Sequence, residues 1–415
     1  MDAVIISIGD ELVLGQTVDT NAAWLSAELA SRGIGTLWHL TVADSRPAIA
    51  DAIRRAASET RLLIITGGLG PTDDDLTRHA LADVLQTALG LDETSLAQIT
   101  EFFTRRQRPM VDRNRIQAMI PAGATALPND VGTAPGIYAQ VGPAQVFIVP
   151  GVPSEMRHLF NVHIAPRLDE LTGDTKRVIR TAMIHCFGEG ESGIAERLGD
   201  LMARDRNPLV GTTVSDGIIS ARLRSEFPTT DQADRELEDT ARLVHEALGP
   251  LVFGRDGQTL PGVVGELLKR NHQTLATAES CTAGLIGKML TDAPGSSDYY
   301  LGGIIVYSDA SKQRDLNIPA DMLNTHGAVS EPVARLLAEN VRERFDADYA
   351  LSVTGIAGPG GATPDKPVGT VHFGLTIRDQ PTQHLHRIFG GTRPFIRDLT
   401  AKTALNLLRL HLLNR

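Results

Sequence analysis

The feature that most constrains this chain is an alternation of short apolar runs with helical patterns, punctuated by glycine-containing turns. In the first 170 residues the strand-like runs are Val4–Ile8, Thr36–Val42, Leu62–Thr66 and Val146–Val149. The helical patterns between and after them are Asn21–Arg32, Ile49–Ala57, about Asp75–Leu85 and Ser154–Leu171. Strands that alternate with helices form parallel sheets covered by helices on both faces. The pattern predicts a doubly wound α/β domain over residues 1–172.

Two further domains are expected, because 415 residues at about 150 per domain correspond to two or three. Residues 176–254 form a small α+β module with strands at Val178–His185 and Ile218–Arg224 and helices at Gly193–Ala203 and Asp231–Ala247. Gly254–Gly262 has the composition of a linker. Residues 258–415 return to α/β patterning, with a helix at Val263–Arg270, strands at Leu275–Ala278, Ile304–Tyr307 and Tyr349–Val353, a more exposed strand at Val371–Ile377, and a closing helix at Phe395–Leu413.

Composition excludes several classes of protein. The net charge is −10, and residues 176–256 carry 11 basic against 14 acidic residues, so nucleic-acid binding is not expected. Two cysteines do not make a disulfide framework or a structural zinc site. No signal peptide is evident, and no apolar run approaches the roughly 18 residues of a membrane span. We expect a cytoplasmic protein without a membrane partner.

The first candidate site is the run from Gly67 to Asp75, Gly-Gly-Leu-Gly-Pro-Thr-Asp-Asp-Asp, between a strand and a helix. Glycines let a backbone approach a phosphate, and a helix N-terminus supplies free N–H donors. A divalent cation would reconcile three aspartates with a phosphate. The alternative is a capping pair of Thr72 and Asp75. The loops Gly9–Gly15 and Pro150–Met156 leave the same predicted sheet edge, although each is also explained as a simple turn.

The second candidate site is in the last domain, where Ser280 lies at a strand-to-helix turn. Such a turn can present a nucleophile near helix N–H groups, and a desolvated Lys312 can act as its base. The loop Val353–Gly361 adds the Thr354 hydroxyl and glycine N–H donors. The alternatives are that Ser280 is a helix N-cap, that Lys312 is a solvated surface residue, and that the neighbouring Cys281 is the nucleophile or a small buried residue.

Histidine is the other reactive side chain in this chain, and its positions are scattered. His326 is of most interest, although Ser330 in the same segment is adequately explained as the N-cap of a helix ending at Phe345.

At these motifs the whole chain resembles the CinA family, the competence/damage-inducible A proteins. The matching stretches are GDELVLGQTVDTN, ITGGLGPTDDDLT, NDVGTAPG, VPGVPSEM, TAESCTAGL, GGIIVYSDASK, HGAVSE and LSVTGIAGPGG with KPVGTV. The resemblance implies an N-terminal molybdopterin-binding-like domain with metal-dependent ADP-ribose pyrophosphatase activity, and a KH-type middle module. It also implies a C-terminal domain that deamidates nicotinamide mononucleotide (NMN) to nicotinate mononucleotide. A homodimer is expected.

The resemblance also assigns residues. Ser280 matches the family's nucleophile, Lys312 its base, Tyr307 a positioning tyrosine and Thr354 a residue near the oxyanion. Substrate-binding positions are expected at Arg393, Gly355, Gly358, Gly67, Gly68, Gly70, Thr72 and Gly151. A divalent metal ion (Mg, Mn or Co) is expected at Asp73, Asp74 and Asp75, and none in the C-terminal domain. Ala283, Glu189 and Asp10 depart from the family pattern without removing a reactive group.

Two other functions stay open. In the first, the N-terminal domain binds a nucleotide or pterin without turnover. In the second, the chain is a scaffold in competence or DNA repair, which the charge balance opposes.

Overall fold

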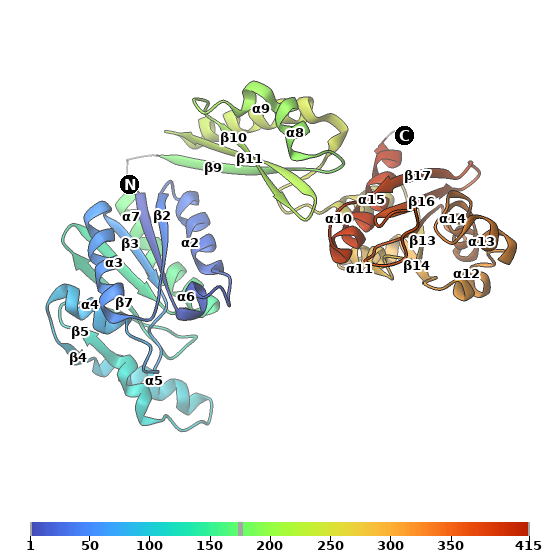
Figure 1. The fold of residues 1–415 in the computed structure, drawn as a ribbon. Coiled ribbons are helices and arrows are strands. Elements are labelled where there is room, and N and C mark those ends of the chain that lie inside the picture. The colour runs from blue at the N-terminus through green and yellow to red at the C-terminus, as the bar shows by residue number, and fades with distance from the viewer. Residues whose placement is uncertain (1, 173–176, 414–415) are drawn as a thin grey trace. The chain divides into compact units, whose positions relative to one another are not determined.

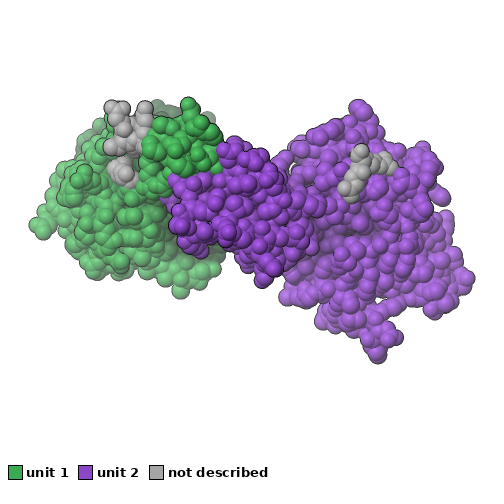
Figure 2. All heavy atoms as spheres, turned by 90° about the horizontal axis from the view of Figure 1, so that it is seen from above, with its two compact units in different colours: residues 1–180, 225–236 green, residues 181–224, 237–415 purple. Residues whose placement is uncertain are grey.

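The computed structural model describes residues 2–172 and 177–413 (Figure 1). It divides into two compact units, Met1–Arg180 with Ser225–Glu236, and Thr181–Arg224 with Leu237–Arg415 (Figure 2). The domain boundary expected between residues 172 and 176 falls on residues 173–176, which lie outside the described part. Within that part, no helix has the length and apolar character needed to cross a membrane.

The N-terminal sheet has six strands in the order β2 (Gly35–Val42), β1 (Asp2–Ile8), β3 (Leu62–Thr66), β8 (Ala144–Val149), β7 (Gly136–Val141) and β6 (Thr125–Leu127). The first four are parallel, as predicted. The sheet is not parallel throughout, because β7 runs antiparallel to both of its neighbours, β8 and β6. A tight turn joins Val141 to Ala144, and a turn this short can only connect antiparallel neighbours.

Helices cover both faces of this sheet, which confirms the doubly wound fold. α2 (Thr20–Ser31) and α6 (Pro153–Leu159) bury Leu25, Leu29 and Met156 on one face. α3 (Arg46–Glu59) and α4 (Thr77–Leu85) cover the other. The remaining elements are α1 (Asp10–Val13), β4 (Leu89–Leu91), α5 (Glu93–Arg105), η1 (Asp112–Ala118), β5 (Met119–Pro121), the π-helical turn η2 (Phe160–Ile164) and α7 (Ala165–Thr172).

The middle module is a four-stranded sheet in the order β10 (Leu209–Ser215), β11 (Ile218–Phe227), β9 (Val178–Cys186) and β12 (Val252–Arg255). Its helices are α8 (Glu191–Leu198), η3 (Gly199–Met202), α9 (Thr230–Leu248) and η4 (Gly249–Leu251). The α+β prediction is confirmed, but β10 and β12 were missed. The linker prediction was wrong at both ends, because Gly254 lies in β12 and Gly262 lies in α10 (Leu260–Arg270).

The C-terminal sheet has the order β14 (Tyr300–Ile305), β13 (Leu275–Glu279), β15 (Tyr349–Gly355), β16 (Thr370–Ile377) and β17 (Gln383–Ile388). The first three strands are parallel, and β16 and β17 are antiparallel to their neighbours. β16 was expected to be exposed, but it is almost wholly buried. β17 is the exposed edge, and it shields β16 from solvent.

Two groups of helices cover this sheet. α10 and α15 (Arg393–Leu413) bury one face, and α14 (Glu331–Phe345) buries the other. The shorter helices are α11 (Leu285–Thr291), η5 (Ser296–Asp298), α12 (Asp309–Leu316) and α13 (Ala320–His326).

Candidate active site

Three candidate loops of the C-terminal domain leave one edge of its sheet. Glu279, the last residue of β13, lies opposite Ile305 of β14 and Val353 of β15. The loops are joined directly after these strands, because Val306 N donates to Glu279 O (2.8 Å) and Ser280 N donates to Val353 O (3.1 Å). The carboxyl ends of parallel strands are where such sheets bind ligands. The three loops therefore lie together at one edge of the sheet.

Ser280 begins a turn and does not cap a helix. Only 7% of the residue is exposed, and Ala283 N donates to its carbonyl (3.1 Å). α11 begins at Leu285 with Gly284 at its N-cap position, so the N-cap interpretation of Ser280 was wrong. Ser280 is therefore a buried serine at the end of β13 without a capping role.

The N-terminus of α11 is capped by a residue that sequence reasoning missed, Glu279. Its carboxylate accepts hydrogen bonds from the backbone N–H groups of Gly284 (3.0 Å), Ile286 (3.1 Å) and Gly287 (2.9 Å). The residue is 2% exposed. The sequence does contain a sign of this role, because Glu279 is a single acidic residue at the end of an apolar strand, and a charge there needs buried hydrogen-bond partners.

This cap corrects the prediction that the helix N–H groups face a ligand, because Glu279 already binds them. The amides of Cys281 and Thr282 differ. Among the described residues, neither donates a hydrogen bond to another residue's backbone or side chain. These two N–H groups are the donors that remain for an oxyanion next to Ser280.

Lys312 is a buried residue of α12 and is not the solvated surface residue of the alternative interpretation. It is 2% exposed, and its Nζ lies 3.5 Å from Tyr307 O and 3.7 Å from an Asp309 carboxylate oxygen. Desolvation by burial lowers the pKa of Lys312, against the opposing charge of Asp309. The Cys281 side chain is also within electrostatic range of this amine. Burial therefore favours the neutral form, which a general base requires.

Arg393 ties the second and third loops together. Its guanidinium donates to the Tyr307 hydroxyl (2.8 Å) and to the Gly358 carbonyl (2.6 Å). Tyr307 is 57% exposed, and Arg393 is exposed as well, so both are accessible to a ligand. Gly355 has a packing explanation, because a Cβ there would lie 2.7 Å from the Val371 side chain.

The Thr354 hydroxyl is engaged elsewhere. It is fully buried and donates its only hydrogen to the carbonyl of Ala328 (2.7 Å). This bond runs against the expected oxyanion role, since a hydroxyl has one hydrogen to give. The same bond anchors the segment between α13 and α14.

Cys281 and the His326 segment have structural roles. Cys281 is 5% exposed, and burial raises the pKa of its thiol to about 12, so it is a poor thiolate nucleophile. Ser330 occupies the N-cap position of α14 but its hydroxyl donates to Gly327 O (2.8 Å), so the predicted side-chain cap is absent.

The glycine loop of the N-terminal domain lines a cavity of about 400 Å³ at the end of β1, β3 and β8. Gly67, Gly68, Gly70 and Gly151, which are expected to bind substrate, border it, whereas Thr72 is not among its lining residues. Gly68 has φ +68°, and a Cβ there would lie 2.0 Å from Thr77 Oγ1, so only glycine fits. The predicted helix begins at Thr77, two residues later than expected.

Asp75 and Arg78 hold this loop in shape. The Asp75 carboxylate accepts from Gly70 N (2.7 Å), from Thr72 N (2.8 Å) and from the Thr72 hydroxyl. Arg78 is 1% exposed and donates to the carbonyls of Leu69 and Gly70. The Thr72–Asp75 pair is therefore real, but it closes the loop and does not cap α4.

The three aspartates do not converge on one point. Asp75 is engaged inside the loop, while the side chain of Asp73 is fully exposed and pairs with Arg113 (2.7 Å). In residues 2–172 and 177–413, no three His, Cys, Asp or Glu side chains are arranged to hold one metal ion. The expectation that Asp73, Asp74 and Asp75 form one ligand set was therefore wrong.

Other carboxylates accompany Asp74 at the cavity. Glu11, Asp44 and Glu155 also line it, and no lysine or arginine is among its lining residues in the described part of the chain. Burial, with the charges of Asp10, Asp74 and Glu11, raises the pKa of Asp44. Magnesium-type ions are commonly held by one or two carboxylates together with substrate phosphates. This donor set fits such an ion, although it is not a preassembled cage.

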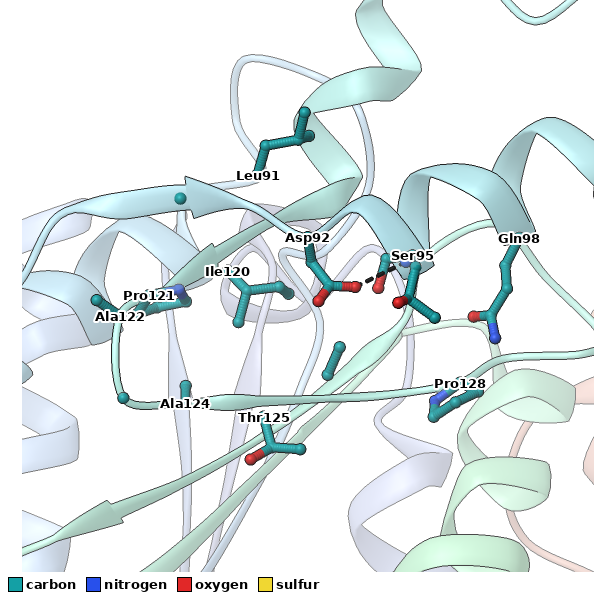
Figure 3. A pocket seen from close by; sticks show the side chains of 14 residues that line it. Leu91, Asp92, Ser95, Gln98, Ile120, Pro121, Ala122, Ala124, Thr125 and Pro128 are labelled. Carbon is teal, nitrogen blue, oxygen red and sulfur yellow. Dashed lines mark hydrogen bonds between the residues drawn. The ribbon is translucent and has the colours of Figure 1, made fainter.

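A second cavity of this domain, of about 450 Å³, lies between the β4–β5 pair and α5 (Figure 3). Its one carboxylate, Asp92, accepts from Ser95 N (2.7 Å) and caps α5. None of the residues predicted from the sequence lines it.

Comparison with known proteins shows the family to which this chain belongs. Models described as "Probable molybdopterin binding domain", "Damage-inducible protein CinA KH domain" and "CinA C-terminal domain" match residues 4–170, 181–254 and 257–412. A "Putative competence-damage inducible protein" of Symbiobacterium thermophilum is 39% identical, with 100% of this chain and 99% of that protein covered. The chain belongs to the CinA family. A "CinA-like protein" of Crocosphaera subtropica is also 39% identical, with 100% of both chains covered.

Solved CinA structures match part of the chain. The competence/damage inducible protein CihA of Agrobacterium tumefaciens is 37% identical, covering 37% of this chain and 93% of that one, with a TM-score of 0.36. The CinA protein of Thermoplasma acidophilum is 34% identical, covering 40% and 97%, with a TM-score of 0.38. The three family models, in the predicted order, and the full-length relatives confirm the resemblance to CinA proteins and the three-part fold class predicted from the sequence.

Proposed function

We propose that the C-terminal domain hydrolyses a carboxamide by a serine–lysine mechanism, with NMN as substrate. The proposal is carried by the burial of Lys312 at the strand edge where the N–H groups of Cys281 and Thr282 bind no other described residue. A lysine whose pKa is lowered and a serine near unused amides are the parts that acyl transfer needs.

Each step of this reaction can be assigned to a group of this chain. Neutral Lys312 takes the proton of the Ser280 hydroxyl as Oγ bonds to the carboxamide carbon. The amides of Cys281 and Thr282 bind the resulting oxyanion. Lys312 then gives the proton to the departing nitrogen, the C–N bond breaks, and ammonia leaves. Water hydrolyses the ester to nicotinate mononucleotide and restores Ser280. Arg393 and Tyr307 lie open to solvent, where they can contact the nucleotide.

The test is ammonia release from NMN by purified protein in EDTA. We expect Ser280→Ala to abolish release while the protein stays folded, because the nucleophile is lost. Cys281→Ala is the matched neighbour, since it keeps the backbone amide and removes only an inert thiol, and it should retain release. Activity that survives in Ser280→Ala and disappears in Cys281→Ala would contradict the assignment of the nucleophile.

For the N-terminal domain we propose metal-dependent hydrolysis of a nucleoside diphosphate sugar, with ADP-ribose as substrate. The supporting observation is a cavity that combines a glycine loop with Asp44, Asp74 and Glu11. Asp74 and Asp44 would hold a divalent ion, which would neutralise phosphate charge when bound. The amides of Gly68 and Leu69, which donate to no other backbone group among the described residues, are placed to contact phosphate oxygens.

Asp74 and Asp73 form a matched pair for the test. Asp74→Asn should lose metal-dependent turnover of ADP-ribose to AMP and ribose 5-phosphate. Asp73→Asn should keep it, because that side chain points into solvent toward Arg113. Asp75 is a poorer choice, since its removal opens the loop whether or not it binds metal. Equal turnover by wild type and Asp74→Asn would argue for a domain that binds its ligand by other groups, or without turnover.

A further inference from the structure

Two charged side chains hold the turn that begins at Ser280, one from each side. Glu279 binds the N–H groups of Gly284, Ile286 and Gly287. Arg397, on the first turns of α15, binds the carbonyls, with Nε donating to Cys281 O (3.0 Å) and Nη2 donating to Thr282 O (2.6 Å). Neither residue is used by the chemistry proposed above.

These bonds determine where the unused amides point. A trans peptide is planar, so its C=O and the following N–H point in opposite directions. When Arg397 binds the Cys281 carbonyl, it therefore orients the Thr282 N–H away from the arginine. The Ser280 carbonyl is similarly bound by Ala283 N (3.1 Å), which orients the Cys281 N–H.

We infer that Arg397 and Glu279 are positioning residues that hold the amides of Cys281 and Thr282 as an oxyanion hole for Ser280. The inference rests on the proposed amidase reaction. Oxyanion donors are effective because they are oriented before the charge develops, so residues that hold the turn rigid contribute to the transition state and not to substrate binding. The structure assigns Arg397 to the carbonyl side of the turn and Glu279 to the amide side.

Arg409 provides a matched control on the same helix. It is also an arginine that binds two backbone carbonyls, those of Val252 (2.8 Å) and Pro250 (2.6 Å). It is 1% exposed, and neither carbonyl belongs to the Ser280 turn. If Arg397→Lys acts only by lowering the free energy of unfolding, Arg409→Lys should therefore have an effect at least as large.

The experiment compares Arg397→Lys, Arg397→Met, Glu279→Gln and Arg409→Lys in the full chain. The readouts are kcat and KM for NMN, affinity for nicotinate mononucleotide, and affinity for pyridine-3-boronic acid, which forms a tetrahedral adduct with a serine. Thermal unfolding is measured for every variant, so that a misfolded protein is recognised.

We expect Arg397→Met and Glu279→Gln to lower kcat by about 10- to 100-fold, less than the ~10²–10³ typical of deleting a whole oxyanion donor. Boronate affinity should fall in parallel, while KM and product affinity stay within about twofold. Arg397→Lys should be intermediate, because one ammonium cannot bind both carbonyls in the same geometry. Arg409→Lys should keep the kcat of the folded fraction.

Three results would overturn the inference. One is a wild-type kcat in Arg397→Met. Another is a loss of product affinity as large as the loss of boronate affinity, which indicates a disrupted pocket. The third is a fall in kcat in Arg409→Lys equal to that in Arg397→Lys. If the wild-type protein releases no ammonia from NMN, the proposed amidase reaction is refuted, and the inference with it. If Ser280→Ala loses ammonia release but Arg397→Met releases ammonia at the wild-type rate, only the inference is refuted.

Discussion

Replacing Thr354 by valine tests whether its hydroxyl binds the oxyanion or only anchors the segment between α13 and α14. The hydroxyl is fully buried and donates to Ala328 O (2.7 Å). Valine has nearly the same shape, so the substitution removes one hydrogen bond and leaves the partly buried Ala328 carbonyl with one partner fewer. A loss of this kind costs about 1–3 kcal/mol of folding free energy.

Three successive carbonyls of this segment are held by side chains. Lys366 donates to His326 O (2.8 Å), Ser330 donates to Gly327 O (2.8 Å), and Thr354 binds the third. Because two of the three bonds survive, we expect the segment to stay in place, and the cost to lie at the low end of that range. On the structural interpretation, kcat for NMN should change by less than about threefold, since no bond to the reacting atoms is lost.

The assay pairs urea unfolding with steady-state ammonia release for Thr354→Val and Thr354→Ser. Thr400→Val is the matched control, because Thr400 is also fully buried and its hydroxyl also donates to a backbone carbonyl, that of Ile396 (2.7 Å). A kcat reduced about 10²–10³-fold, equivalent to about 2.7–4 kcal/mol, with unchanged KM and restored by serine, would refute the structural interpretation. The hydroxyl would then be an oxyanion donor that rotates away from Ala328.

Three further predictions concern Lys312, His372 and Gly68. Asp309→Asn removes a charge that raises the pKa of Lys312, so the acidic limb of the pH–kcat profile should move to lower pH; an unmoved limb would argue against Lys312 as the base. Burial, then the neighbouring histidines, lower the pKa of His372 from 6.5 to about 4. The unfolded chain therefore binds the extra proton between these values, so stability should fall as pH drops from 6.5 toward 4, and His372→Phe should flatten this dependence in urea titrations. Gly68→Ala places a Cβ 2.0 Å from Thr77 Oγ1 and should abolish ADP-ribose turnover while leaving ammonia release from NMN intact; loss of both would show that the two sites depend on one another.

Both glycine-containing loops of this chain are held by one carboxylate and one arginine. Asp75 binds backbone N–H groups of the N-terminal loop, and Arg78 binds its carbonyls. Glu279 and Arg397 do the same for the Ser280 turn. In each case one carboxylate binds backbone N–H groups of the turn and one arginine binds its carbonyls, so the turn is held on both sides.

Much of the fold could be predicted from the sequence, because periodicity is a local property. Apolar runs predicted the parallel strands of both α/β sheets, although the run expected at Ile304–Tyr307 coincides with β14 only at Ile304 and Ile305. β4 and β12 were missed because three and four residues carry little periodic signal. β10 was missed because Gly211 and two threonines interrupt its apolar residues. β16 was expected to be exposed because alternation along one strand does not reveal that β17 and α14 cover it.

In the C-terminal candidate site, too, some features could be predicted from the sequence and others depend on the tertiary structure. The sequence by itself determined that Ser280, Lys312 and the Thr354 loop lie at one sheet edge, since parallel strands end together. Only the tertiary structure decided that Lys312 is buried, that Thr354 binds Ala328, and that Asp73 turns away from Asp75. It also brought Arg397, 117 positions after Ser280 in the chain, onto the turn that Ser280 begins. Burial, and the choice of a hydrogen-bond partner from a distant segment, depend on packing between elements and leave no periodic trace in the sequence.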